Sequence, residues 1–380
     1  MVSVSLSAIL AAMRIGIDAR LVYYRPGGIA EYTRHVIQEL AALDQTTRYS
    51  VIHHHRDCKT LTPGPNFRRI NTYTPCHHRL ERWTLSVELA RRHFDVLHSP
   101  DMIPPQRGGR RGVITVHDLH FMHYPQFMTA ESLRHYRDQI AWAVHAADHI
   151  LVSSHATRDD LGNLLAVPAA KMTVHLLGVD RAFAPLAQGA VALHRQRLGL
   201  PMSYILFVGT FEPRKNISGL LEAYHLLRQD GPDLPPLVIV GRRGWLYDGI
   251  FAKIETLDLA DRVIWLEDAP ESDLPAIYNG ADVAVLPSYY EGFGLTALEA
   301  MACGTPVVAT NRSSLPEVVG DAGLLIDPYD PADIAVAIRR ILEDSDLRDQ
   351  LRRAGPARAA TFTWQRTAEI VLQVYRALCS

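Results

Sequence analysis

Two glutamates frame a glycine-rich turn in the second half of the sequence, Glu291-Gly-Phe-Gly-Leu-Thr-Ala-Leu-Glu299. Gly292 and Gly294 allow the backbone to approach a ligand closely, and the first turn of the following helix adds partial positive charge that suits a phosphate. Glu299 can accept hydrogen bonds from the two vicinal hydroxyls of a ribose, and Glu291 can do the same for a sugar. The alternative is a capping box formed by Thr296 and Glu299, which leaves Glu291 and the glycines unexplained.

A second cluster pairs two cations in the segment Gly209-Thr-Phe-Glu-Pro-Arg214-Lys215-Asn. Arg214 and Lys215 follow a predicted strand and precede a predicted helix, so both cations and the helix amides could together neutralise a diphosphate. No acidic pair with a metal-site context accompanies them, and we expect no metal ion here. The alternative is a solvated turn with both side chains in water, which the position at a strand end disfavours.

Two weaker clusters lie in the first half of the chain. Gly27 and Gly28 stand at the mouth of a predicted helix and indicate close approach to an anion or a sugar, although many such pairs are only turns. His117 ends the predicted strand GVITV, and Asp118 and His120 make the same patch polar. A capping Asp and a structural His explain that patch equally well.

The elements that must position these clusters follow one pattern, because short apolar runs alternate with longer amphipathic stretches. This alternation is typical of βα units and a parallel sheet. It occurs twice, with a break at Gly178–Pro201. Strands are predicted at Arg14–Asp18, Tyr49–His53, Val96–His98, Val113–Val116, His149–Val152, Met172–His175, Tyr204–Val208, Leu237–Val240, Val263–Leu266, Val283–Leu286, Pro306–Thr310 and Gly323–Ile326. Helices are predicted at Ile29–Leu43, Leu80–Arg92, Ala130–Ala147, Ser154–Leu165, Ile217–Arg228, Phe251–Leu257, Leu274–Gly280, Ala297–Cys303, Pro331–Glu343 and Trp364–Leu378.

The bulk composition indicates a two-domain globular protein, since 380 residues exceed one ordinary core. The formal net charge is −2, which gives no indication of nucleic-acid binding. Lys plus Arg outnumber Asp plus Glu by 20 to 16 in residues 1–180, and are outnumbered by 19 to 25 in residues 181–380. The basic first half could face an anionic acceptor or a membrane surface, or it could reflect drift of surface composition.

The four cysteines form no CxxC pair and no zinc-finger spacing, which indicates a reducing cytoplasm and no metal site. Residues 1–12 are small and apolar but lack a basic start and are too short to span a bilayer. We expect them to be a disordered or misannotated extension. Any membrane contact is therefore expected to be peripheral, at the inner face and through the N-terminal domain.

Together these motifs resemble the retaining GT-B glycosyltransferases of family 4, along nearly the whole chain. The E-x7-E element from Glu291 to Glu299, followed by EAMACGTPVVAT and LPEVVGDAG, is its most specific part, and GTFEPRKN is nearly as specific. The GGI loop and the pair His117-Asp118 fall in the expected order. The resemblance implies an α/β fold of two Rossmann-like doubly wound parallel-sheet domains, an interdomain cleft and a final helix that crosses back to the first domain.

The resemblance also implies roles for the motif residues. Arg214 and Lys215 would hold the donor diphosphate, Glu299 the ribose, and Glu291 the donor sugar, while His117 would contact the transferred sugar. These assignments make His117, Arg214, Lys215 and Glu291 the expected catalytic residues. The other expected donor-binding residues are Gly27, Gly28, Gly209, Gly292, Phe293, Gly294, Leu295 and Glu299. The expected acceptor residues are Tyr32, Asp118 and His120.

The implied reaction is metal-independent transfer of a hexose, with retention, to a glycan or lipid-linked acceptor in cell-surface polysaccharide or glycoconjugate synthesis. The segments EPRKN and HDLHFMHYP resemble those of mannosyl- and rhamnosyltransferase-like members that use GDP sugars. This resemblance favours mannose from GDP-mannose, with a UDP sugar as the alternative donor. The alternatives are a nucleotide-sugar epimerase of the same fold, which the E-x7-E and EPRKN motifs disfavour, and an inactive binding protein, which the intact set of charged motif residues disfavours. A dinucleotide oxidoreductase is disfavoured because no GxGxxG follows an early strand.

The expected domain limits follow from the break and the final helix. After the extension at residues 1–12, an acceptor domain is expected at residues 13–185 and a donor domain at residues 186–362. Residues 363–380 are expected to pack back on the first domain. The sequence leaves the acceptor and the oligomeric state open.

Overall fold

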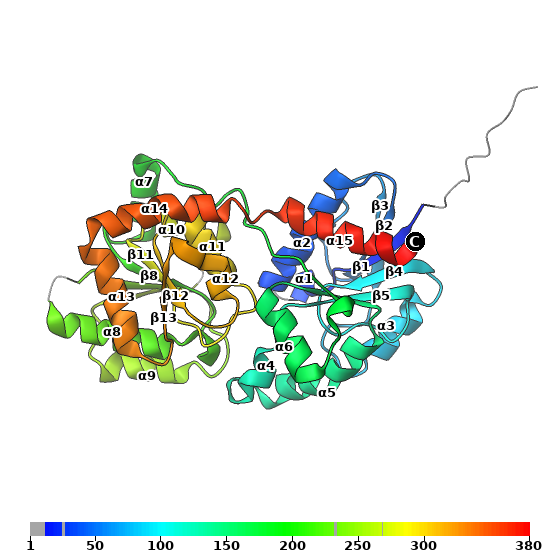
Figure 1. The fold of residues 1–380 in the computed structure, drawn as a ribbon, viewed down its shortest axis with the longest axis horizontal. Coiled ribbons are helices and arrows are strands. Elements are labelled where there is room, and N and C mark those ends of the chain that lie inside the picture. The colour runs from blue at the N-terminus through cyan, green and yellow to red at the C-terminus, as the bar shows by residue number, and fades with distance from the viewer. Residues whose placement is uncertain (1–11, 25–26, 232–233, 268) are drawn as a thin grey trace, which may run out of the picture.

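The computed structural model describes residues 12–24, 27–231, 234–267 and 269–380. In this part of the chain two parallel sheets, each flanked by helices, form two lobes (Figure 1). The predicted α/β class with two Rossmann-like domains is confirmed. The predicted extension at residues 1–12 lies, apart from Ala12, outside the described residues.

The sheet of the first domain has the strand order β3-β2-β1-β4-β5-β6-β7 among the described residues, and all neighbours are parallel. The order reverses between β1 and β4, and in such sheets ligands bind beyond the carboxyl ends at that point. The strands are β1 (Arg14–Asp18), β2 (Arg48–His54), β3 (Phe67–Thr72), β4 (Phe94–Ser99), β5 (Gly109–Val116), β6 (His149–Val152) and β7 (Met172–Val174).

Strand β3 has no counterpart among the predicted strands. Its segment FRRINT buries Phe67, Ile70 and Thr72, while Arg68 and Asn71 are exposed. Such a polar edge strand, paired only with β2, resembles a loop in composition. The pairing partner, rather than local hydrophobicity, decides that this segment is a strand.

The sheet of the second domain has the described order β10-β9-β8-β11-β12-β13, again parallel throughout. Its order reverses between β8 and β11. The two strongest sequence clusters follow these two strands, so the topology brings them to one edge of the sheet. The strands are β8 (Ile205–Val208), β9 (Leu237–Val240), β10 (Val263–Leu266), β11 (Val283–Leu286), β12 (Val307–Thr310) and β13 (Leu324–Ile326).

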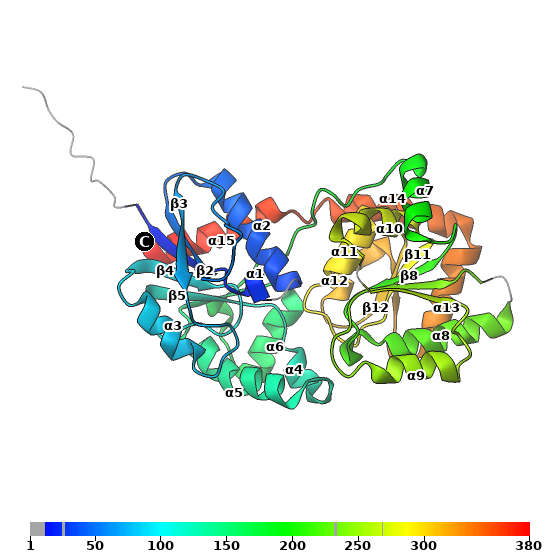
Figure 2. The same cartoon turned by 180° about the vertical axis from the view of Figure 1, so that it is seen from behind.

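Helices cover both faces of each sheet (Figures 1 and 2). The first domain contains α1 (Leu21–Tyr24), α2 (Gly28–Leu43), α3 (Glu81–Leu89), α4 (His120–His123), α5 (Ala130–Ala146) and α6 (His155–Leu165). The second contains α7 (Gln188–Leu198), α8 (Ile217–Asp230), α9 (Asp248–Thr256), α10 (Leu274–Gly280), α11 (Leu295–Ala302), α12 (Leu315–Val319), α13 (Pro331–Glu343) and α14 (Ser345–Ala359), and α15 (Trp364–Cys379) follows.

Five of these helices were not predicted: α1 and α4, which have only 4 residues each, and α7, α12 and α14. Helix α7 lies inside the expected break at Gly178–Pro201 and buries Val191 against the second domain. Helix α12 has 5 residues, which is too short to establish a helical period. Helix α14 is strongly polar and buries mainly small side chains, so its inner face is hard to recognise from hydrophobicity.

The final helix α15 packs against α2 and β4 of the first domain, as predicted (Figures 1 and 2). Thr367 Oγ1 donates a hydrogen bond to Leu176 O over 2.7 Å, and Tyr375 OH lies 2.6 Å from His98 Nδ1. These bonds tie the end of the chain to the first sheet.

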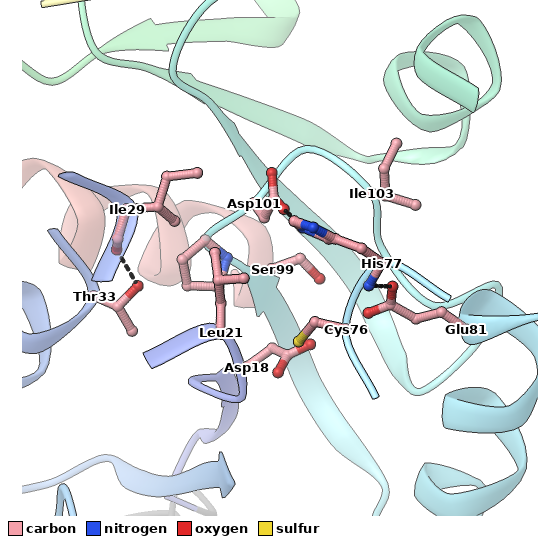
Figure 3. A pocket seen from close by; sticks show the side chains of 11 residues that line it. Asp18, Leu21, Ile29, Thr33, Cys76, His77, Glu81, Ser99, Asp101 and Ile103 are labelled. Atoms are coloured by element: carbon pink, nitrogen blue, oxygen red, sulfur yellow. Dashed lines mark hydrogen bonds and ion pairs between the residues drawn. The ribbon is translucent and has the colours of Figure 1, made fainter. Parts of the chain in front are cut away.

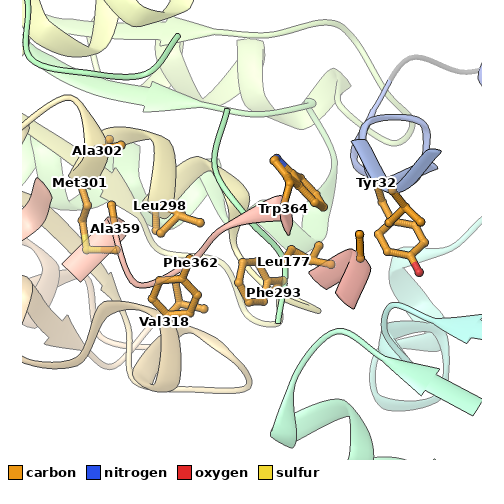
Figure 4. Close-up of a cluster of buried hydrophobic side chains, with 14 of the residues drawn as sticks. Tyr32, Leu177, Phe293, Leu298, Met301, Ala302, Val318, Ala359, Phe362 and Trp364 are labelled. Atoms are coloured by element: carbon orange, nitrogen blue, oxygen red, sulfur yellow. The ribbon is translucent and has the colours of Figure 1, made fainter. Parts of the chain in front are cut away.

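Buried apolar side chains of both domains meet in one cluster beside the connecting segments (Figure 4). The rings of Phe293 and Phe362 lie 5.8 Å apart, and Trp364 stacks on His35 at 4.6 Å. Phe293 of the glycine-rich turn belongs to this cluster, so the turn is anchored in the buried core.

Candidate active site

The glycine-rich turn leads directly into α11, whose N-cap is Gly294 with φ 102°. This left-handed backbone favours glycine, and an added Cβ would lie 2.4 Å from Leu315 Cδ2. No side chain of the described residues caps this helix. The N-terminus of α11 is therefore a suitable site for an anion.

The capping-box alternative is wrong, because Thr296 lies inside α11 rather than at its N-cap. Glu299 instead accepts a hydrogen bond of 2.9 Å from Tyr278 OH. Burial raises the pKa of Glu299 to about 7. The side chain is thus fixed within the second domain, and its carboxyl group titrates near neutral pH.

Gly292 brings the two walls of the cleft into contact. An added Cβ would lie 2.2 Å from His117 O and 2.8 Å from Asp118 Cβ, both in the first domain. Ser153 Oγ donates to His117 O over 2.8 Å and to Gly292 O over 3.3 Å, which bridges the two domains. Residue 292 must therefore be a glycine, because any Cβ would collide with the backbone of the first domain.

Arg214 and Lys215 converge on one carboxylate. Arg214 Nη1 donates to Glu291 Oε2 over 2.8 Å, and Lys215 Nζ donates to Glu291 Oε1 over 2.6 Å. Burial alone would raise the pKa of Glu291, but both cations outweigh it and lower that pKa to about 2. Ser288 Oγ adds a bond of 2.7 Å to Glu291 Oε1. The carboxylate stays ionised at any physiological pH.

The solvated-turn alternative for the cations is wrong. The side chains of Arg214 and Lys215 are each 13% exposed, and Arg214 also donates to Glu212 Oε1 over 2.5 Å. An added Cβ on Gly209 would lie 3.7 Å from Lys215 Cδ, which places this predicted donor residue beside the cation. Asn216 caps α8 by accepting a bond from Gly219 N.

The N-termini of α2 and α11 face each other across the cleft. Gly27 is the N-cap of α2, with φ 148°, and no described side chain caps that helix. An added Cβ on Gly28 would lie 3.8 Å from Cδ1 of Leu295, the first residue of α11. The partial positive charges of two helices therefore point into the same space.

His117 presents one fixed ring edge to the protein. Its Nε2 lies 3.0 Å from Pro100 O, and the ring packs edge-on against Tyr32 at 4.9 Å. Since a carbonyl can only accept, Nε2 carries the proton and Nδ1 remains an acceptor. Burial lowers the pKa of His117, so the ring stays neutral and can accept a bond from a sugar hydroxyl.

Asp118 and His120 bind mainly each other. Asp118 Oδ1 lies 2.6 Å from His120 Nδ1, and His120 Nε2 lies 2.9 Å from Met128 Sδ. Burial would raise the pKa of Asp118, but His120 lowers it well below its usual range. This arrangement fits a structural pair beside Arg214 better than a free acceptor contact.

The predicted acceptor contact of Tyr32 is wrong for this structure. Its side chain is fully buried, and its hydroxyl lies 3.1 Å from Thr115 Oγ1 and 2.9 Å from His175 Nε2. Burial raises the pKa of Tyr32. Tyr32 packs against the ring of His117, and its side chain has no exposed surface that an acceptor could contact.

Several residues of the site were not predicted. Glu212, Ser153 and Tyr278 contact Arg214, Gly292 and Glu299, respectively. Glu212 stands one residue before Pro213, so its proximity was visible in the segment EPRKN. Ser153 and Tyr278 carry no local signal, because their partners lie far away in the sequence.

Metal ligands and membrane spans were sought among the residues that the structure describes. Within them, no three His, Cys, Asp or Glu side chains lie together as metal ligands. No described helix combines the length and the apolarity needed to cross a bilayer. The described cysteines are all free thiols.

The model of the family "Glycosyl transferases group 1" matches residues 194–358, and that of "Glycosyltransferase Family 4" matches residues 26–183. The chain belongs to this glycosyltransferase family. It is therefore a transferase with the GT-B fold, as predicted. The domain limits expected from the sequence remain predictions.

Two curated relatives and one solved structure locate the chain within the family. The chain is 35% identical to the O-antigen chain mannosyltransferase B of Escherichia coli, over 81% of this chain and 80% of that one. It is 36% identical to the D-inositol 3-phosphate glycosyltransferase of Salinispora arenicola, over 74% of this chain and 68% of that one. HepE of Anabaena, solved with UDP and glucose, has the same fold, with a TM-score of 0.76, 20% identity and coverage of 96% and 100%.

Proposed function

We propose that this glycosyltransferase moves a hexose, with retention and without a metal ion, from a nucleotide sugar to a glycan or lipid-linked acceptor. The proposal rests on Arg214 and Lys215, which meet at Glu291 just before α11, and on the N-terminus of α11, which lies beside Gly28 at the start of α2. Two cations and two helix N-termini suit a diphosphate that gains negative charge as it leaves. The pathway served is cell-surface polysaccharide or glycoconjugate synthesis.

Each side chain has a distinct role in this proposal. Arg214 and Lys215 bind the donor diphosphate, with Gly209 beside them. Glu299 accepts hydrogen bonds from the ribose, and Glu291 orients both cations and accepts from the donor sugar. The backbone of residues 292–295 and the glycine pair at residues 27–28 line the phosphates and the sugar. The neutral ring of His117 accepts a bond from the transferred sugar.

The reaction then needs little covalent chemistry from the protein. The bond between the anomeric carbon and the phosphate oxygen breaks, and the nucleoside diphosphate leaves with the electron pair. The acceptor hydroxyl attacks the anomeric carbon from the same face, and its proton passes to the departing phosphate. Arg214 and Lys215 stabilise the developing charge. The contact of Gly292 with the first domain helps to exclude water from the closed cleft.

Mannose from GDP-mannose is the donor we favour, because the bacterial relative that matches along four fifths of the chain is named a mannosyltransferase. A UDP sugar is the alternative, since HepE was solved with UDP and glucose. A thermal-shift screen of GDP, UDP and ADP sugars distinguishes them. A donor at about 100 times its Kd adds ~2.7 kcal/mol of stability, equivalent to a rise in Tm of about 3 °C for a chain of this length.

The same screen tests the whole proposal. The proposal is supported if GDP-mannose stabilises the protein and GDP is released only when an acceptor is present. If only UDP sugars stabilise the protein, the donor is a UDP sugar. An epimerised nucleotide sugar without acceptor would identify an epimerase. Binding without turnover by any acceptor mixture would indicate an inactive binding protein.

We also propose peripheral contact with the inner face of the cytoplasmic membrane through α3. Leu80, Trp83 and Val87 form one helical stripe and are 45%, 43% and 77% exposed. An apolar stripe flanked by cations suits an anionic bilayer. The flanking exposed cations are Arg14, Arg79, Arg91, Arg92, Arg107 and Arg110.

Vesicle flotation tests this contact. We expect the protein to float with vesicles that contain phosphatidylglycerol but not with pure phosphatidylcholine, and we expect salt to weaken the binding. The substitution Trp83→Glu should abolish flotation, while Leu193→Glu, at an exposed site of the second domain, should not. Equal flotation of both variants would overturn the contact.

A further inference from the structure

A small cavity opens at the carboxyl edge of the first sheet, beside the cleft (Figure 3). It measures about 20 Å³, which is room for about one water molecule or one hydroxyl group. Its polar lining comes mainly from the ends of β1 and β4, the loop after β4, the loop that leads into α3 and the first residue of α3. These residues are Asp18, Cys76, His77, Glu81, Ser99 and Asp101.

The carboxylates of the cavity are held rigidly by other protein groups. Asp101 Oδ2 lies 2.8 Å from His77 Nε2, and Glu81 accepts a bond of 2.6 Å from His77 N. Arg20, buried behind the cavity, donates to Asp18 Oδ2 over 2.7 Å and to Glu81 Oε1 over 2.6 Å. The walls are therefore built before any ligand binds.

One polar group of the lining has no partner. Ser99 is 3% exposed, and its Oγ makes no hydrogen bond to any of the described residues. A buried hydroxyl without a partner is costly, and a ligand that supplies one restores the lost bond. The cavity thus has the size and the vacant hydrogen-bond capacity for one hydroxyl group.

The cavity adjoins the predicted point of transfer. Pro100 lines it and at the same time fixes the ring of His117 through its carbonyl. Ile29 and Thr33 line it from the first turns of α2, whose N-terminal Gly28 faces Leu295 of the donor domain. A sugar that places one hydroxyl in the cavity would lie against the donor sugar.

The charge of the cavity decides which acceptors it tolerates. Asp18, Glu81 and Asp101 supply three carboxylates, and none of the described residues that line it is Lys or Arg. The opposing groups are Arg20, already bonded to two of the carboxylates, and His77. Such a surface repels a phosphate dianion but accepts a neutral hydroxyl as a donor.

We propose that this cavity is an acceptor subsite that takes one hydroxyl or hydroxymethyl group of an uncharged sugar. The acceptor end is then a neutral glycan residue, unlike the phosphorylated polyol named for the inositol phosphate relatives. The hydroxyl donates to Asp101 or Asp18 and accepts from Ser99 Oγ. This inference rests on the proposed glycosyl transfer and specifies its acceptor class.

The substitution Ser99→Ala provides the sharpest test. It removes an unpartnered hydroxyl, so the fold should keep or gain stability. In the presence of GDP, we measure binding of paired probes by saturation-transfer NMR: mannose with mannose 6-phosphate, and myo-inositol with inositol 1-phosphate. We expect the neutral member of at least one pair to bind at least about tenfold more tightly than its phosphorylated partner, and Ser99→Ala to weaken it about 2- to 10-fold. Asp101→Asn should reduce the difference in affinity between the neutral probe and its phosphorylated partner, because it removes one negative charge.

Ser50→Ala is the matched control, because Ser50 is also 3% exposed but lies in β2 and bonds Arg68. Three results would each overturn the subsite. The phosphorylated member of each pair binds more tightly, neither neutral member binds at about 50 mM, or Ser99→Ala and Ser50→Ala have equal effects on binding. Thermal shift with nucleotide sugars is run first on the same preparations. Loss of every nucleotide response would defeat the proposed function, whereas an intact response with a failed probe series would defeat only this subsite.

Discussion

Lys215 Nζ and Glu291 Oε1 lie 2.6 Å apart, so a carboxylate from the turn after β11 neutralises a cation from the turn after β8. Arg214 bonds the other oxygen of the same carboxylate and also Glu212. The four side chains carry two positive and two negative charges. A diphosphate that enters this cluster must therefore compete with Glu291 for both cations.

Replacement of Glu291 should separate nucleotide binding from turnover. Glu291→Gln leaves a net positive charge, so we expect the nucleoside diphosphate to bind about tenfold more tightly, while kcat/KM for transfer falls about 10² to 10³-fold because the cations and the sugar lose their anchor. Calorimetry and a product-release assay measure the two effects. The exposed Glu255→Gln is the control, and weaker nucleotide binding by Glu291→Gln would contradict the counter-ion role.

Acid should remove the contribution of Glu291 to stability. Its folded-state pKa is lowered to about 2 from a usual value near 4.5, so the contribution is complete above pH 4.5 and disappears as the pH falls towards 2. The difference corresponds to about 3 kcal/mol. Urea unfolding between pH 3 and 7 should show a steeper acid loss for the wild type than for Glu291→Gln. Identical pH dependence of both proteins would contradict the prediction.

Donor affinity should rise with pH around neutrality because of Glu299. Burial raises its pKa to about 7, so the carboxylate proposed to accept the ribose hydroxyls forms as the pH increases from 6 to 8. The effect of pH on the free energy of unfolding has the opposite sign. The raised pKa of Glu299 stabilises the folded state fully below the unfolded pKa of this group, and this stabilisation is lost as the pH rises through 7. Nucleotide titrations at pH 6, 7 and 8 measure the first effect. Glu299→Gln should flatten the profile, and an unchanged profile would assign the dependence to the phosphates.

Substitution of Gly292 should block closure without destroying the donor site. A Cβ at this position would lie 2.2 Å from His117 O, so Gly292→Ala forces the two walls apart. We expect kcat to fall at least about 100-fold and the Kd for nucleotide to change little. Small-angle scattering should report a more open particle with nucleotide bound. Gly189→Ala, where an added Cβ meets nothing within 4 Å, should behave as the wild type.

Tyr32 should matter for stability and not for acceptor choice. Tyr32→Phe leaves Thr115 and His175 without this partner inside the first domain, which costs about 1 to 3 kcal/mol of unfolding free energy. We expect KM for the acceptor to stay within about twofold. A normal unfolding free energy combined with a large rise in acceptor KM would instead make Tyr32 an acceptor contact.

The expected site was predicted from motifs at strand ends and from the family resemblance that these motifs carry. The cations of the segment after β8 and the glutamates around β11 were predicted as one ligand site, and the structure joins them through Glu291. The sequence did not predict which side chain each motif residue would bond. The capping-box alternative, for example, fails because Gly294 rather than Thr296 is the N-cap of α11, and because Glu299 bonds Tyr278, 21 residues away.

The sequence by itself determined the alternation of strands and helices, the family and the positions of the charged motifs, because periodicity and turn chemistry are local properties. The tertiary structure alone decided that Tyr32 is buried, that Gly292 touches His117, and that Asp18, Glu81 and Asp101 share one cavity. These relationships join segments that lie far apart in the chain. They depend on the order of the strands and on the closure of two domains, which no local pattern encodes.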